Sequence, residues 1–295
     1  MKVIGLVLLF PLLFLTGCWG GELIDEQNQD ILFQKGKGVI RFDYYKPLSH
    51  KPVNIHYYIP EGNSKEMPVL FLLPGINRNA EDYLQAWEKY AINKKVMIFS
   101  LEFSSAMYSS EEYIEGGMFK NNTLKPEEEW TFSIIEPIFE FICKDLSGTQ
   151  KTYDLWGHSA GAQFVHRYLM FKPQAHVNRA VSANAGWYTL PDIDTEYPYG
   201  LKNTLITADV LPDLLSKSLI VQLGTADTDE NDPNLNHTPG ADAQGKNRYD
   251  RGLYFFSKAT DLGKNYECFN WSKVEVKGVG HSYTQMAANA AGLMY

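Results

Sequence analysis

The residues best suited to chemistry in this 295-residue chain surround Ser159. The pentapeptide Gly157-His-Ser-Ala-Gly161 sets this serine between two glycines, with a small alanine directly after it. An apolar run of strand length precedes the motif, and apolar residues at helical spacing follow it as far as Phe171. A serine on so sharp a strand-to-helix turn projects its hydroxyl from the sheet edge, at a helix N-terminus that favours negative charge. The pattern therefore predicts a nucleophilic serine.

A serine hydroxyl becomes a useful nucleophile only when a base accepts its proton and an acid orients that base. Asp227 ends a Gly-Thr-Ala-Asp sequence after a late apolar strand, and His281 ends a Gly-Val-Gly-His sequence after the last strand. Both residues should therefore lie at the same edge of the sheet as Ser159. We expect Asp227 to orient His281, with Asp229 as the nearest rival in the same loop. His158 is expected to be only a spacer in the turn.

The elements that must position these groups alternate along the chain. Continuous apolar runs, such as residues 69–73, are typical of strands covered on both faces. Strands are predicted at 39–45, 53–59, 69–73, 96–101, 153–156, 180–185, 219–223 and 274–276, the first two as an antiparallel pair. Helices are predicted after Asn79, across 130–146, from the serine turn to 171, across 249–262 and after His281. This alternation indicates one α/β domain with a mostly parallel, doubly wound sheet.

The chemical groups occur in the order Ser, Asp, His, which is the order found in α/β-hydrolases. Over residues 38–295 the chain resembles that superfamily, and within it the secreted esterases of the polyhydroxyalkanoate-depolymerase and feruloyl-esterase type. The resemblance implies an α/β-hydrolase fold and hydrolysis of carboxylic esters, with Ser159 as nucleophile, His281 as general base and then acid, and Asp227 as the orienting carboxylate. No cofactor is expected. A serine peptidase of the same fold and a catalytically silent surface binding protein are the competing interpretations.

An acyl-transfer site also needs two hydrogen-bond donors for the oxyanion of the tetrahedral intermediate. One should be the backbone N–H of Ala160, directly after the nucleophile. The other should come from the loop after strand 69–73, where Pro-Gly-Ile76 stands in place of the family's commoner His-Gly-x. Ile76 is the expected donor and Asn77 the alternative.

Two irregular, aromatic-rich segments, 103–129 and 186–217, leave the carboxyl ends of predicted strands. Open α/β sheets bind ligands at that edge. Trp187 and Tyr188 begin the second segment, so we expect them to line the substrate pocket. The competing interpretation is that both rings only fill the core beneath a loop. The substrate is expected to be a small-molecule or polymeric ester whose identity the sequence leaves open.

The N-terminus carries a different signal. A lysine at position 2 is followed by an almost wholly apolar run, residues 3–15, whose last residue begins the sequence Leu15-Thr-Gly-Cys18. This arrangement resembles the lipobox of bacterial lipoproteins, in which the cysteine is lipidated and becomes the first mature residue. We predict a signal peptide at 1–17, a lipidated Cys18 with a polar tether to residue 37, and the hydrolase domain at 38–295. The protein would be anchored by lipid to a membrane of the cell envelope, facing the periplasm or the exterior. An ordinary secretory signal is the alternative.

Composition and cysteine content limit which partners, metals and disulfides can be expected. The net charge is −8 and no dense basic run is present, which argues against a nucleic-acid partner. The acidic run that starts at Asp227 superficially resembles a calcium loop, but Asp232 and Thr238 replace its required glycine and glutamate. No metal is therefore expected. Cys143 and Cys268 could form a disulfide or remain thiols, and the sequence leaves both possibilities open.

Overall fold

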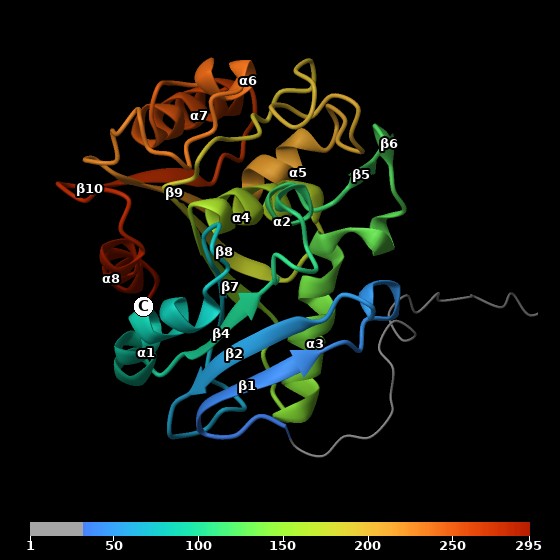
Figure 1. Ribbon diagram of the computed structural model, residues 1–295, viewed down its shortest axis with the longest axis vertical. Coiled ribbons are helices and arrows are strands. Elements are labelled where there is room, and N and C mark those ends of the chain that lie inside the picture. The colour runs from blue at the N-terminus through green and yellow to red at the C-terminus, as the bar shows by residue number, and fades with distance from the viewer. Residues whose placement is uncertain (1–31) are drawn as a thin grey trace, which may run out of the picture.

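The computed structural model describes residues 32–295, which fold around one eight-stranded sheet (Figure 1). The strand order is β1-β2-β4-β3-β7-β8-β9-β10. The strands are β1 (Gly36–Phe42), β2 (Val53–Ile59), β3 (Val69–Leu73), β4 (Met97–Glu102), β7 (Tyr153–His158), β8 (Val177–Ala183), β9 (Leu219–Gly224) and β10 (Trp271–Val276). β2 is antiparallel to β1 and to β4, and every other pairing is parallel. The predicted mostly parallel sheet with an antiparallel opening pair is confirmed.

Helices follow the strands in alternation. They are α1 (Ala80–Lys94), α2 (Ser110–Ile114), α3 (Ile135–Asp145), α4 (Ala160–Phe171), α5 (Leu211–Ser216), α6 (Pro239–Asp242), α7 (Arg248–Gly263) and α8 (Tyr283–Met294). The two irregular segments predicted from the sequence contain only short elements. These are α2, α5, the two-residue strands β5 (Phe119–Lys120) and β6 (Thr123–Leu124), and a 3₁₀ turn at Glu127–Glu129. Further 3₁₀ turns lie at Lys46–Leu48 and Thr131–Ile134, the latter opening the helix predicted for 130–146.

Alternating side chains of the central strands divide the interior into two cores. In β3, every second side chain, from Val69 through Phe71 to Leu73, faces a core formed with α3, α4 and α7. The side chains between them, Leu70 and Leu72, face a core formed with α1 and α8. Successive residues of a strand point to opposite faces, so a wholly apolar strand requires helices on both. Figure 1 shows α1 and α8 together on one side of the sheet.

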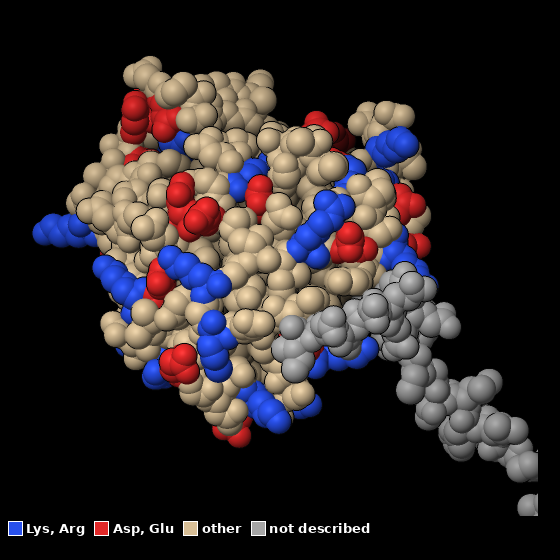
Figure 2. Space-filling model, turned by 60° about the horizontal axis from the view of Figure 1, so that its bottom comes forward, with Lys and Arg blue, Asp and Glu red and all other residues tan. Residues whose placement is uncertain are grey.

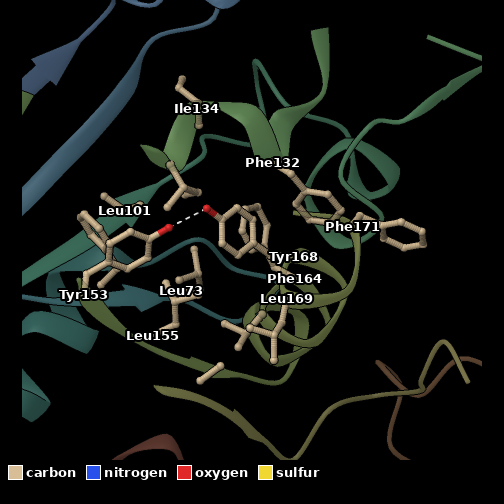
Figure 3. Packing of buried hydrophobic residues seen from close by; sticks show 14 of the residues in the cluster. Leu73, Leu101, Phe132, Ile134, Tyr153, Leu155, Phe164, Tyr168, Leu169 and Phe171 are labelled. Atoms are coloured by element: carbon tan, nitrogen blue, oxygen red, sulfur yellow. Dashed lines mark hydrogen bonds between the residues drawn. The ribbon is translucent and has the colours of Figure 1, made fainter. Parts of the chain in front are cut away.

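Helix α4, which begins directly after Ser159, is buried along its whole length. Figure 3 shows its aromatic face packing against the segment before α3, where the Phe132 and Phe164 rings lie 4.9 Å apart. The hydroxyls of Tyr153 in β7 and Tyr168 in α4 are 2.6 Å apart, so a hydrogen bond joins the strand and the helix on either side of the serine. Packing on all sides fixes the position of the turn between them.

The N-terminal boundary of the domain differs from the prediction. Phe33 is 2% exposed, and its ring lies 5.0 Å from that of Tyr57. The backbone N–H groups of Leu32 and Phe33 both donate to the carboxylate of Asp145 in α3. Residues 32–37, predicted as tether, therefore belong to the folded domain, because one buried aromatic ring anchors an otherwise polar segment. The predicted signal peptide, Cys18 and the rest of the tether lie outside the described residues.

The surface carries no dominant charge of one sign on the face seen in Figure 2, where basic and acidic side chains are interspersed. Within residues 32–295, no helix has the length and apolar character needed to cross a bilayer. Cys143 is half-buried, Cys268 is exposed, and both are free thiols.

Candidate active site

Ser159 occupies a strained turn between β7 and α4. Its backbone has φ 57° and ψ −116°, a conformation that a non-glycine residue adopts only when its surroundings enforce it. A side chain at Gly157 would place its Cβ 2.2 Å from the carbonyl oxygen of Gly161, and one at Gly161 would lie 1.8 Å from that of Leu73. Both glycines are therefore sterically required, as the sequence motif predicts.

His281 and Asp227 meet at the same sheet edge, in the loops after β10 and β9. The distance from His281 Nδ1 to Asp227 Oδ2 is 2.7 Å, and Asp227 is 4% exposed. This hydrogen bond fixes the orientation of the imidazole and leaves Nε2 as its other functional atom. Asp229 is exposed instead, and its carboxylate accepts the backbone N–H of Asn231. The structure thus pairs His281 with Asp227 and not with the rival aspartate.

Arg248 supports this pair, although no sequence motif singled it out. Its guanidinium is 2% exposed, with Nη1 2.8 Å from Asp232 Oδ2 and 3.7 Å from Asp227 Oδ1. The hydrogen bond from Arg248 lowers the pKa of Asp232. Asp232, Arg248, Asp227 and His281 form a row of alternating acidic and basic groups, called here the charged row. One sequence feature could have identified Arg248: it is the first residue of α7. A cation at a helix N-terminus opposes the helix dipole and therefore requires carboxylate partners.

His158 lies behind His281 rather than serving only as a spacer. The two ring centroids are 4.5 Å apart, and His158 Nδ1 is 3.1 Å from the Tyr83 hydroxyl. Burial, and then the nearby His281 and Arg248, hold the pKa of His158 well below its usual range. His158 therefore stays uncharged and forms a packed wall that limits rotation of the His281 ring.

Two small cavities meet at Ser159, with volumes of about 150 Å³ and about 140 Å³. The residues that line both are Ile76, Ser159, Asn234 and Arg248. His281 lines only the larger cavity, whereas Ile114 and Trp187 line only the smaller one. A substrate bond held at Ser159 could therefore extend one group into each cavity. Asn234, which sequence reasoning missed, belongs to an exposed loop without periodicity.

The two backbone groups predicted to bind an oxyanion lie next to the serine. Ala160 is the first residue of α4, and Ile76 lines both cavities. A Cβ built on Gly75 would lie 3.6 Å from Ser159 Cβ, so the loop after β3 packs directly against the serine. Among residues 32–295, neither the Ala160 nor the Ile76 N–H has an acceptor. Both are therefore available to a ligand oxygen. Asn77, the alternative donor, is exposed and lines only the larger cavity.

The structure separates the two aromatic residues predicted to line the pocket. Trp187 faces the smaller cavity, and its ring lies 4.0 Å from the buried guanidinium of Arg167. Tyr188 has no exposed surface and stacks on Phe255 of α7 with ring centroids 4.4 Å apart. Tyr188 thus fills the core and borders neither cavity at Ser159, which corrects the expectation that both rings line the pocket.

The acidic run after β9 is occupied by protein contacts. Asp227 pairs with His281, Asp232 with Arg248, and Asp229 with a backbone N–H of its own loop. In the part of the chain that the structure describes, no three His, Cys, Asp or Glu side chains are grouped as metal ligands would be.

Comparisons with known proteins give the following similarities. No protein-family model and no curated protein matches the chain. Its structure is similar to that of poly(aspartic acid) hydrolase-1 from Sphingomonas sp. KT-1, with TM-score 0.85, 38% identity, and 88% of this chain and 99% of that chain covered. It is also similar to that of a poly(3-hydroxybutyrate) depolymerase from Bordetella parapertussis, with TM-score 0.84 and 28% identity. The match covers 89% of this chain and 90% of that chain. The fold is shared with an S-formylglutathione hydrolase from Agrobacterium tumefaciens, which is 13% identical. That match has TM-score 0.53 and covers 92% of this chain and 96% of that chain.

Proposed function

The chain belongs to the α/β-hydrolase superfamily and is a hydrolase, and we propose that it cleaves carboxylic esters through Ser159, His281 and Asp227. The observation that carries the proposal is the buried 2.7 Å contact between Asp227 and His281 at the sheet edge where Ser159 is held in its strained turn. Three loops far apart in sequence provide the groups that we propose as nucleophile, base and orienting acid. Because all three groups are present, the geometry favours an enzyme over a catalytically silent binding protein.

The proposed reaction proceeds in two halves. Ser159 Oγ attacks the ester carbonyl carbon while His281 Nε2 accepts the hydroxyl proton, and the N–H groups of Ala160 and Ile76 stabilise the oxyanion. The intermediate then collapses, the bond to the alkoxy oxygen breaks, and His281 returns the proton to the departing alcohol. Water, deprotonated by the same histidine, attacks the acyl-enzyme, and release of the carboxylic acid restores Ser159.

The size of the cavities supports a substrate with short groups on both sides of the scissile bond. Volumes of about 150 Å³ and about 140 Å³ fit small acyl and alcohol units rather than long alkyl chains. The two similar proteins that are 38% and 28% identical to this chain are named for polymers of short repeating units, poly(aspartic acid) and poly(3-hydroxybutyrate). We therefore propose a polymer or oligomer of a short hydroxy acid as the substrate class.

A second candidate is amide hydrolysis at the same site. Poly(aspartic acid) is joined by amide bonds, and the relative named for its hydrolysis is 38% identical to this chain. The acyl-enzyme chemistry is the same for both bonds, except that His281 must protonate an amine rather than an alcohol. Direct comparison of substrates therefore separates the two candidates.

The cellular setting is also a proposal. The apolar run that ends at Cys18 supports lipidation of that cysteine and anchoring to a membrane of the cell envelope. A catalytic domain held outside the cytoplasm would meet polymers that are too large to enter a cell.

A fluorophosphonate probe tests the catalytic proposal. It should label wild-type protein and leave Ser159→Ala unlabelled. Circular dichroism should show that both proteins are equally folded. Nitrophenyl esters of graded chain length should then be hydrolysed fastest when the acyl chain is short. Oligomers of 3-hydroxybutyrate and of aspartic acid, assayed side by side, decide between ester and amide cleavage. Ester hydrolysis by Ser159→Ala at the wild-type rate would contradict the assignment.

A further inference from the structure

The turn that carries Ile76 is held in place from a distant segment of the chain. Tyr113, in α2, donates a hydrogen bond from its hydroxyl to the carbonyl oxygen of Pro74 at 2.7 Å, and both residues are buried. Burial raises the pKa of Tyr113, so the hydroxyl stays protonated and keeps this bond at any pH the enzyme would meet. The peptide plane that begins at Pro74 is thereby fixed, two residues before Ile76.

Arg78 completes the restraint from the other end of the turn. Its guanidinium lies 3.8 Å from the centroid of the Tyr113 ring, and Nη1 donates to the carbonyl of Phe103 at 3.1 Å. The Arg78 backbone N–H donates to the carbonyl of Gly75 at 3.0 Å, and its φ of 55° is a conformation that costs energy for a non-glycine residue. Arg78 is 4% exposed, so this arrangement is packed rather than solvated.

The same tyrosine also contacts the helix that carries the nucleophile. Its ring centroid lies 5.5 Å from that of Phe164 in α4. Its chain neighbour Ile114 lines the smaller cavity. One residue thus links the turn after β3 with the helix after Ser159, which are the two elements that provide the proposed oxyanion donors.

From these contacts we infer that Tyr113, together with Arg78, is a positioning residue that sets the Ile76 N–H against the oxyanion formed at Ser159. The inference rests on the proposed function. Gly75 has no side chain that could restrain this part of the turn, so the turn depends on its own backbone hydrogen bond from Arg78 to Gly75 and on the contact from Tyr113. Because oxyanion stabilisation depends on donors placed before the reaction begins, loosening the turn should affect the transition state more than substrate binding.

Tyr113→Phe tests this inference because it removes one hydroxyl and keeps the ring on Arg78. We expect kcat for a nitrophenyl ester to fall by about 10- to 100-fold, with KM changed by less than about 2-fold. A boronic acid, which forms a tetrahedral adduct with the serine, should bind more weakly by a similar factor. Both measurements are made well below the melting temperature of the variant.

Tyr108→Phe is the matched control. Tyr108 belongs to the same segment, is 1% exposed and donates its hydroxyl to a backbone carbonyl, but that of Lys51 rather than one in the turn after β3. This control should lose comparable stability and keep wild-type kcat and boronic acid affinity.

Wild-type kcat in Tyr113→Phe, or an equal loss in both variants, would overturn the inference. If Tyr113→Phe does not fold, Arg78→Lys decides, because lysine keeps the charge but not the flat guanidinium that stacks on the ring. It should show the same selective loss of kcat, and unchanged kcat would count against the inference. Wild-type protein that fails to react with a fluorophosphonate contradicts the proposed function itself, and that result is obtained before any variant is assayed.

Discussion

Replacing Asp227 by asparagine would remove the charge that orients His281 while keeping the size of the side chain. The carboxylate accepts a hydrogen bond from His281 Nδ1 at 2.7 Å and is 4% exposed, so no water can readily take its place. An asparagine amide can hold the imidazole in the wrong tautomer, with its proton on Nε2. Loss of the orienting carboxylate costs about 10⁴ in kcat, which corresponds to about 5.4 kcal/mol of activation free energy.

The stability of the variant should change much less than its activity. Arg248 loses one facing carboxylate at 3.7 Å but keeps its shorter contact with Asp232 at 2.8 Å. We therefore expect Asp227→Asn to lower the free energy of unfolding by only about 1 kcal/mol. The activity loss should consequently persist at temperatures where the variant is fully folded.

The assay compares kcat of Asp227→Asn and Asp229→Asn on one nitrophenyl ester, with thermal unfolding of each. Asp229 is exposed and bonded only within its own loop, so its substitution should leave kcat within about 3-fold of wild type. Comparable activity losses in the two variants, or a larger loss for Asp229→Asn, would refute the reasoning.

Three further predictions concern the pocket, the anchor and the thiols. Trp187→Ala should destabilise the fold by about 3 kcal/mol and should also change the specificity constants of short and long esters unequally. A uniform decrease of these specificity constants would show that the ring only supports the fold. Wild-type protein expressed in bacteria should partition into detergent, and Cys18→Ala should be released or left unprocessed; a soluble, unlipidated wild type would exclude the anchor. Burial raises the pKa of the Cys143 thiol to about 11, so below that pH this thiol stays protonated. Alkylation near pH 8 should modify exposed Cys268 well before Cys143, as peptide mass spectrometry can measure, and equal rates would contradict the burial.

The sequence was most informative where local geometry dictates residue type. Gly157 and Gly161 are required because any side chain there would collide with backbone, and such a requirement can be read directly from a motif. The apolar strands were equally clear, because β3 is buried on both faces and therefore contains no polar residue. The boundaries were less exact, since β1 begins at Gly36, before the predicted start at residue 39.

Other parts of the site depend on contacts between distant segments and left no periodic signal. Arg248 and Asn234 come from the loop and helix after β9, and only the folded chain brings them to Ser159. Trp187 and Tyr188 are adjacent in sequence, yet one borders a cavity and the other stacks in the core. Composition could not distinguish them, because both environments favour an aromatic ring.

The charged row has a consequence for how the protein responds to its medium. In the proposed mechanism His281 begins as the base, and Asp232, Arg248 and Asp227 together carry one net negative charge. When His281 takes the serine proton the row becomes neutral, and the negative charge moves to the oxyanion at the ends of β3 and α4. This transfer takes place between groups whose positions are already fixed: Asp227 and Arg248 are at most 4% exposed, and the side chains of His281 and Asp232 are 26% and 21% exposed. Dissolved ions act through water, so the chemical step should depend only weakly on salt concentration. If the chain is anchored in the cell envelope as proposed, its catalytic rate should then vary little while the ionic strength outside the cell changes.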